Sequence, residues 1–130
     1  AFHNLVFVSI NKSYPMQGYK VMHGLWGMGQ MMFSKYIIIV DDDVDVHNTS
    51  EVLFRLGANT DPQRDTIFTR GPADVLDHAT NEIASGSKLG IDATEKLPGE
   101  SGFHREWPPL IKMDEAIKKK VDDLMGCIQD

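Results

Sequence analysis

A cluster of acidic side chains follows an apolar segment in the first half of the chain. Residues 36–40 read Tyr-Ile-Ile-Ile-Val, and the side chains that follow include Asp41, Asp42, Asp43, Asp45 and His47. Hard cations such as Ca²⁺ and Mg²⁺ take several carboxylate oxygens as ligands. In a strand alternate residues share a face, so at most Asp41, Asp43 and Asp45 converge. The same acids are also suited to capping helix ends, pairing with Arg or Lys, or facing water. The cation site and these structural roles both stay open as interpretations.

Other polar groups give weaker signals. Arg64, Arg70 and Arg105 each stand beside acids, which favours structural ion pairs, such as Arg70 with Asp74, over clamps for a substrate. The histidines have no metal-ligand spacing, and neither HExxH nor CxxC occurs, so zinc is not predicted. Residues 85–87, Ser-Gly-Ser, resemble a phosphate-binding turn only loosely, because the spacing of a P-loop is missing.

Apolar segments alternate with helical patterns along the chain. The predicted strands cover residues 5–10, 36–40, 66–69 and 88–93, and the predicted helices cover 19–33, 49–57 and a final segment from Asp114. Strands that alternate with helices predict an α/β fold. We expect one domain over 1–130, a three-layer, mostly parallel sheet with helices on both faces. A long irregular C-terminal arm and the final helix complete it.

Glycines and prolines mark several expected boundaries. Three glycines inside the first helical pattern, Gly24, Gly27 and Gly29, predict either close packing against another backbone or a distorted helix. Gly57 is the expected end of the second helix. Gly71 and Pro72 are expected to open a turn or a brief helix.

The C-terminal third contains two apolar features that need a partner surface. Phe103 and Trp107 lie in the otherwise polar arm of residues 96–109. The final helix carries an apolar stripe, which consists of Ile117, Val121, Leu124, Met125 and Ile128. The surface that these residues contact is the domain itself, a partner subunit, or a part of the protein outside this chain.

Composition narrows the class of protein. The chain has 130 residues, 42% of them hydrophobic, and a net charge of −6, which argues against nonspecific nucleic-acid binding. No segment is long and apolar enough to span a membrane. The single cysteine, Cys127, fits a cytoplasmic setting and is read as a semi-buried apolar side chain. The chain starts at Ala1 with a strand almost at once, so we expect it to be part of a longer protein.

Four blocks of sequence resemble the UbiD family of carboxy-lyases, in that family's order and at its spacing. They are FSKYIIIVDDDVDV at 33–46, TDPQRD at 60–65, GSKLGIDAT at 86–94 and REWP at 105–108. The resemblance extends over almost the whole chain. The nearest member type is the 3-octaprenyl-4-hydroxybenzoate carboxy-lyase of ubiquinone biosynthesis, and related members act on menaquinone precursors.

The resemblance implies the non-oxidative decarboxylation of an aromatic acid with prenylated FMN and Mn²⁺. In this family the metal ligands, the flavin contacts and the acid/base carboxylates belong to N-terminal and central regions that this chain does not match. We therefore assign no catalytic, cofactor-binding or metal-binding residue here, and we expect the chain alone to bind no cofactor and to be inactive.

What this chain resembles is the family's C-terminal domain, which forms the main subunit contact and closes over the active site. That role implies the missing domains and a second copy as partners. By this resemblance Ser87, Lys88, Leu89 and Gly90 border the substrate pocket, and Phe103, Trp107, Leu124 and Ile128 belong to an interface. The alternative is a stand-alone acidic module that binds a cation or a nucleotide.

Overall fold

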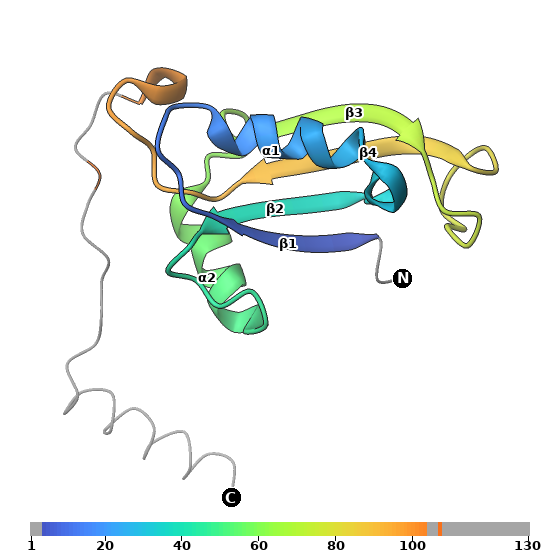
Figure 1. Cartoon of the computed structure of the whole chain (residues 1–130), viewed down its shortest axis with the longest axis horizontal. Coiled ribbons are helices and arrows are strands. Elements are labelled where there is room, and N and C mark those ends of the chain that lie inside the picture. The colour runs from blue at the N-terminus through green and yellow to red at the C-terminus, as the bar shows by residue number, and fades with distance from the viewer. Residues whose placement is uncertain (1–3, 104–106, 108–130) are drawn as a thin grey trace, which may run out of the picture.

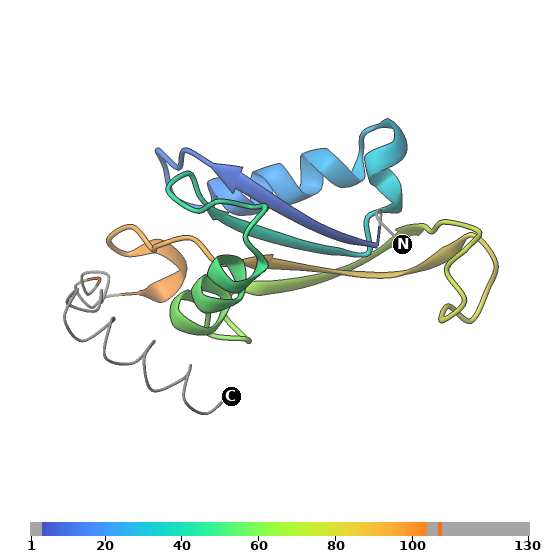
Figure 2. The ribbon, with the colours of Figure 1, turned by 90° about the horizontal axis from the view of Figure 1, so that it is seen from below.

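The computed structural model describes residues 4–103 and 107 and shows a mixed sheet between two helices. The described sheet has four strands in the order β1-β2-β4-β3. Their bounds are Leu5–Ile10 for β1, Tyr36–Asp41 for β2, Thr66–Pro72 for β3 and Ser85–Asp92 for β4. The helices α1 (Gln17–Trp26) and α2 (Thr49–Asn59) cover opposite faces (Figures 1 and 2). The predicted α/β architecture is therefore confirmed.

One edge strand departs from the parallel arrangement. β1, β2 and β4 run parallel, whereas β3 runs antiparallel to β4. The twelve residues that connect β3 and β4 form turns and no crossover helix, so the chain returns antiparallel. Both strands are longer than predicted, and residues 73–84 form turns instead of the brief helix considered. Asp74 and Asp77 shape these turns by accepting backbone hydrogen bonds from Leu76 and Ala79.

β2 forms the centre of the core because both of its faces are buried. Ile37 and Ile39 pack with Met22 under α1. Ile38 and Val40 pack on the other face with Val52 of α2. A strand covered on both sides has no polar face, which explains the unbroken apolar segment in the sequence.

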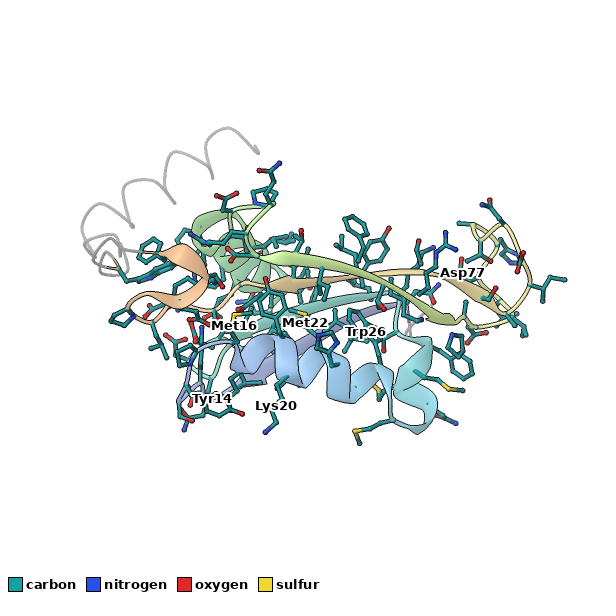
Figure 3. The ribbon with its side chains drawn as sticks, turned by 90° about the horizontal axis from the view of Figure 1, so that it is seen from above. Tyr14, Met16, Lys20, Met22, Trp26 and Asp77 are labelled. Atoms are coloured by element: carbon teal, nitrogen blue, oxygen red, sulfur yellow. The ribbon has the colours of Figure 1, made fainter. Side chains whose placement is uncertain are left out.

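The first helix ends earlier than predicted. α1 stops at Trp26, and a separate 3₁₀ helix, η1 (Gly29–Phe33), follows. Gly29 has a φ of 38°, which an uninterrupted helix does not allow. Figure 3 shows Met22 and Trp26 between α1 and the sheet, with Lys20 on the outer side.

Of the two alternatives predicted from the helix glycines, the structure shows the distorted helix and not close packing at Gly24, which has open space where a Cβ would lie. The close approaches occur at other glycines. A Cβ on Gly90 of β4 would overlap the Met22 sulfur, and one on Gly18 would lie 2.9 Å from Asp92 Cγ.

The second helix begins as predicted and ends later. The Asn48 side chain accepts a hydrogen bond from the backbone N–H of Glu51, at 3.3 Å, and so caps α2. The helix passes through Gly57 and ends at Asn59. The reason is that the Asn59 amide is buried and donates to the carbonyl of Ala93 at 3.1 Å, which ties the last turn to the sheet.

Beyond β4 the chain crosses the carboxyl edge of the sheet and forms a short 3₁₀ helix, η2 (Glu100–Gly102). The predicted final helix, with Leu124 and Ile128, and the Arg105 ion pair lie outside the described residues. None of the helices in the described part is long and apolar enough to cross a membrane.

Candidate functional site

The aspartates at the end of β2 are occupied by contacts within the protein. Asp41 Oδ2 accepts the backbone N–H of Glu95 at 3.0 Å, and Asp43 Oδ2 pairs with Arg55 at 2.9 Å. Asp45 Oδ1 accepts the backbone N–H of His47. Among residues 4–103 and 107, no group of three His, Cys, Asp or Glu side chains is placed to hold a metal ion. The capping and pairing interpretation is thus the one that the geometry supports.

A buried ionic network lies at the same edge and joins two of the sequence blocks. Arg64 donates to both oxygens of Asp65, at 2.8 and 2.6 Å. The ammonium of Lys96 lies 3.8 Å from Asp65 Oδ1 and 4.0 Å from Asp92 Oδ2. Lys96, Asp65 and Asp92 are all buried. The predicted structural ion pair of Arg64 is confirmed.

Burial governs the proton affinities in this network. Burial lowers the pKa of Lys96, although Asp92 and Asp65 oppose that shift. Burial also raises the pKa of Tyr19 to about 12, helped by the negative charges of Asp65 and Asp92. Burial therefore disfavours the charged form of Lys96, which the two neighbouring carboxylates favour, and it keeps Tyr19 neutral.

A second buried ion pair extends the network toward the start of α1. Lys12 pairs with Glu100, whose other oxygen accepts the backbone N–H of Met16 at 2.7 Å. Burial alone would raise the pKa of Glu100, but the hydrogen bonds from Lys12, Met16 and Leu97 outweigh it and hold that pKa below its usual value. Sequence reasoning missed Lys12, Lys96 and Glu100. The one available signal was the position of Lys12 and Lys96 directly after strands, where the carboxyl edge gathers polar groups.

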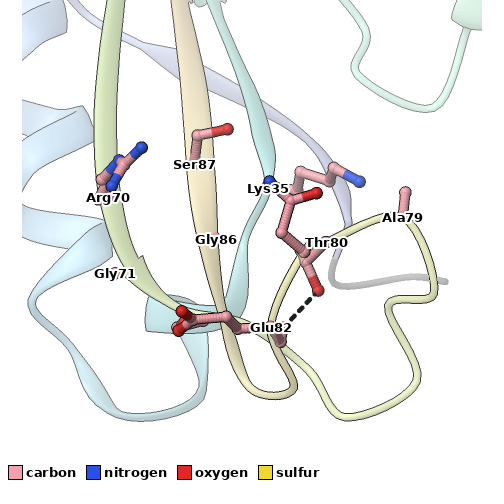
Figure 4. A pocket seen from close by; sticks show the side chains of 10 residues that line it. Lys35, Arg70, Gly71, Ala79, Thr80, Glu82, Gly86 and Ser87 are labelled. Carbon is pink, nitrogen blue, oxygen red and sulfur yellow. Dashed lines mark hydrogen bonds between the residues drawn. The ribbon is translucent and has the colours of Figure 1, made fainter.

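The opposite edge of the sheet has an open cavity of about 520 Å³ (Figure 4). Lys35, Arg70 and Ser87 line it, together with residues of the turn between β3 and β4. Lys35 pairs with Asp77 at 3.2 Å. Arg70 has no ion pair with any described residue, so its predicted pairing with Asp74 is wrong; Asp74 instead caps its own turn. The cavity therefore presents a free guanidinium beside hydroxyl groups.

The four residues expected at a pocket edge occupy different environments. Ser87 lines the cavity, and Leu89 is half-buried on the α2 side of the sheet. Lys88 and Gly90 are buried on the α1 side. The Lys88 ammonium donates to the carbonyl of Ser34 at 3.2 Å, and burial lowers its pKa. Only Ser87 and Leu89 therefore have surface that another molecule can reach.

Phe103 and Trp107 contact each other and the ionic network. Their ring centroids lie 5.0 Å apart. The Arg64 guanidinium lies 5.4 Å from the Phe103 centroid, and the Lys96 ammonium lies 5.7 Å from that of Trp107. Both rings remain half-buried and border a smaller cavity of about 200 Å³ beside the end of α2. The two rings thus cover part of the ionic network, and part of each ring stays exposed to solvent.

Comparison with known proteins gives consistent matches. The family model described as the 3-octaprenyl-4-hydroxybenzoate carboxy-lyase C-terminal domain matches residues 1–93. A protein of Aquifex aeolicus (strain VF5) is 49% identical over 123 residues, which are 95% of this chain and 25% of that protein. The chain therefore spans about a quarter of the length of this relative.

Solved structures share the fold. The closed form of the vanillic acid decarboxylase of Sedimentibacter hydroxybenzoicus has a TM-score of 0.73 and 29% identity, covering 91% of this chain and 26% of that one. Its open form has a TM-score of 0.74 and 25% identity, covering 95% and 26%. The UbiD-class enzyme HmfF of Pelotomaculum thermopropionicum, solved with FMN, has a TM-score of 0.67 at 22% identity, covering 89% and 25%, and supports the fold alone.

Proposed function

This chain belongs to the 3-octaprenyl-4-hydroxybenzoate carboxy-lyase (UbiD) family as its C-terminal domain, and we propose that it assembles and closes a decarboxylase whose reactive centre lies on other domains. The match of the C-terminal-domain model to residues 1–93 is the observation that carries this proposal. The parent reaction is the non-oxidative decarboxylation of an aromatic acid in ubiquinone or menaquinone biosynthesis, in the cytoplasm.

The contacts within the chain support a role without chemistry of its own. The buried acids and bases at the carboxyl edge pair with one another, and the described residues do not form a metal site. They therefore do not fit Mn²⁺, and no step is assigned through prenylated FMN in this chain. The HmfF structure that shares this fold was solved with FMN, and we extend a flavin to the parent enzyme as part of this proposal.

A closing role also has support. The vanillic acid decarboxylase that shares this fold was solved in a closed and an open form. In this chain the cavity at Ser87 and Arg70 is open to solvent, and its lining includes the bases Arg70 and Lys35 and the acid Glu82. We place this edge, with Ser87 and the neighbouring Leu89, at the border of the substrate pocket, where Arg70 attracts an anionic aromatic acid. Lys88 and Gly90 lie buried behind that edge, on the α1 side of the sheet.

Assembly is the part of the proposal that this chain tests directly. We place Phe103, Trp107, Leu124 and Ile128 in the contact between copies. Sedimentation velocity from 1 to 100 μM is expected to show a monomer converting to a dimer. A monomer over the whole range would contradict the assembly role, whereas the closing role would still stand on its own observations.

A further inference from the structure

The cavity beside Arg70 has a polar lining throughout. The 10 described residues that line it include no apolar side chain larger than the methyl group of Ala79. Figure 4 shows Arg70 and Ser87 on neighbouring strands and Glu82 on the turn beside them. Pockets for small molecules are usually lined by hydrophobic and aromatic side chains. The lining of this cavity therefore restricts the kind of chemical group that it can bind.

Two hydrogen-bond donors are held side by side in the lining. Arg70 and Ser87 occupy directly opposite positions in β3 and β4. Opposite residues in an antiparallel pair project from the same face, with Cβ atoms about 5 Å apart. The guanidinium forms no ion pair within the described part of the chain. A guanidinium fork and a hydroxyl are thus both available to donate to an oxygen atom of a ligand.

Glu82 supplies an acceptor on the same cavity. Its Oε2 accepts a hydrogen bond from the Ser85 hydroxyl at 3.3 Å, and a β-bridge between the same two residues closes the turn. Among the described residues this is the one hydrogen bond that the carboxylate accepts. A carboxylate has about four lone-pair sites, so Glu82 can also accept a proton donor on a ligand.

The charges around the cavity balance one another. Arg70 and Lys35 are positive, whereas Glu82 is negative, and Asp77 pairs with Lys35 at 3.2 Å. A balanced lining does not favour a dianion such as phosphate over a neutral group. A hydroxyl group on an aromatic ring matches it, because the oxygen accepts from Arg70 or Ser87 and the proton is donated to Glu82.

The proposed function determines which end of the substrate reaches this cavity. The carboxyl group that leaves as CO₂ must lie at the reactive centre, which that proposal places on other domains. The end that reaches the edge at Ser87 is therefore the end opposite the carboxyl group. An isoprenoid tail at that end would cover charged and hydroxyl groups without giving them hydrogen-bond partners, which is unfavourable.

We propose that this cavity binds a ring hydroxyl of a small aromatic acid at the end away from its carboxyl group, with Arg70 and Ser87 as donors and Glu82 as acceptor. The inference rests on the proposed function and deepens it, because it narrows the substrate to a hydroxylated aromatic acid without an isoprenoid tail. These three residues determine specificity and take no part in breaking the bond to CO₂.

Titration of the ¹⁵N-labelled chain with four aromatic probes, followed by NMR, tests the proposal. Catechol has two ring hydroxyls, whereas 1,2-dimethoxybenzene keeps both oxygens and has no proton to donate. Phenyl phosphate is a simple anion, and prenylcatechol adds one isoprene unit to catechol. None of the four carries a carboxyl group, so binding reports on the opposite end of the substrate alone. The amide signals of Arg70, Glu82 and Ser87 show whether a probe occupies the cavity.

Two pairs of variants separate the cavity from the rest of the surface. Arg70→Leu removes the donor fork, and Glu82→Ala removes the acceptor. Their matched controls are Lys20→Leu, on the outer side of α1, and Glu95→Ala, at the carboxyl edge. All four side chains are exposed, so the changes leave the core intact, and circular dichroism verifies the fold.

We expect catechol to shift the three amide signals and to bind roughly fivefold or more tightly than each of the other probes, as loss of one hydrogen bond implies. Arg70→Leu and Glu82→Ala should each weaken catechol binding by a similar factor, whereas both controls should bind it as the parent chain does. Catechol that shifts none of the three signals would overturn the proposal. So would another probe that binds as tightly as catechol, or controls that weaken binding as much as the cavity variants.

The outcome is separate from the test of the proposed function. If catechol fails to bind and sedimentation still shows a dimer, only the assignment of the cavity falls. If this chain retains flavin or turns over a substrate, the proposed function is rejected whatever catechol does.

Discussion

Gly18 shows how one residue sets the distance between α1 and the ionic network. A Cβ at this position would lie 2.9 Å from Asp92 Cγ and from Asp92 Oδ1. Asp92 Oδ1 accepts hydrogen bonds from the backbone N–H and the hydroxyl of Thr94, at 3.1 and 2.6 Å, whereas Oδ2 is buried without a hydrogen-bond partner among the described residues and lies 4.0 Å from the Lys96 ammonium. Glycine is therefore required here for space.

The change Gly18→Ala is expected to lower the free energy of unfolding by about 1–3 kcal/mol, because the buried carboxylate has to shift. Gly24→Ala is the matched control in the same helix, since a Cβ there meets nothing within 4 Å. That control is expected to be neutral or stabilising by up to about 1 kcal/mol. Urea denaturation measures both, and equal effects would contradict the close approach at Gly18.

Tyr19 gives a test of the network's charge. Its pKa is raised to about 12, so the folded protein keeps the phenol proton that the unfolded chain loses near 10. The stabilisation is complete below pH 10 and declines as the pH rises toward 12. We expect Tyr19→Phe to show a smaller loss of stability than the parent chain between pH 9 and 11. Parallel curves for the two proteins would show that Tyr19 titrates as an ordinary tyrosine.

At the scale of elements, the Lys12–Glu100 pair ties η2 to the loop before α1. Both side chains are almost fully buried. Glu100→Gln leaves the Lys12 charge unpaired and is expected to cost about 3 kcal/mol of stability at pH 7. Glu95→Gln, the same chemical change at an exposed position, is expected to remain within about 0.5 kcal/mol.

The effect of Glu100→Gln should also depend on pH. The pKa of Glu100 is lowered from its usual 4.5, so its contribution is complete above 4.5 and is lost as the pH falls through the lower folded value. The difference in stability between the two proteins should therefore shrink in acid. Chemical denaturation at pH 3 and pH 7 measures it, and a constant difference would mean that packing, not charge, explains the loss.

Elements with a local signal were predictable from the sequence. The apolar segment of β2 and the Asn48 cap fix a buried strand and the start of α2. The end of α2 was missed because a tertiary hydrogen bond from Asn59 to Ala93 outweighs the helix-stopping tendency of Gly57. The antiparallel β3 and the ionic network depend on pairing between distant residues, such as Lys12 with Glu100, which spacing does not reveal.

At the scale of the whole molecule, the buried charges at the carboxyl edge stabilise the fold by pairing with one another. The carboxyl edge, where open α/β sheets usually bind ligands, is filled here by matched charges and covered by Phe103 and Trp107. At the opposite edge the cavity beside Arg70 is open to solvent. This distribution fits a domain that supports a reactive centre located on other parts of the enzyme.

Incubation of this chain with prenylated FMN and Mn²⁺ tests that central claim most directly. After desalting, absorbance is read for retained flavin, and CO₂ release from vanillic acid and 4-hydroxybenzoic acid is measured. The vanillic acid decarboxylase of Sedimentibacter hydroxybenzoicus is the positive control. We predict that this chain retains no flavin and releases no CO₂ above a protein-free blank. Stoichiometric flavin retention, or turnover by these 130 residues alone, would contradict the account.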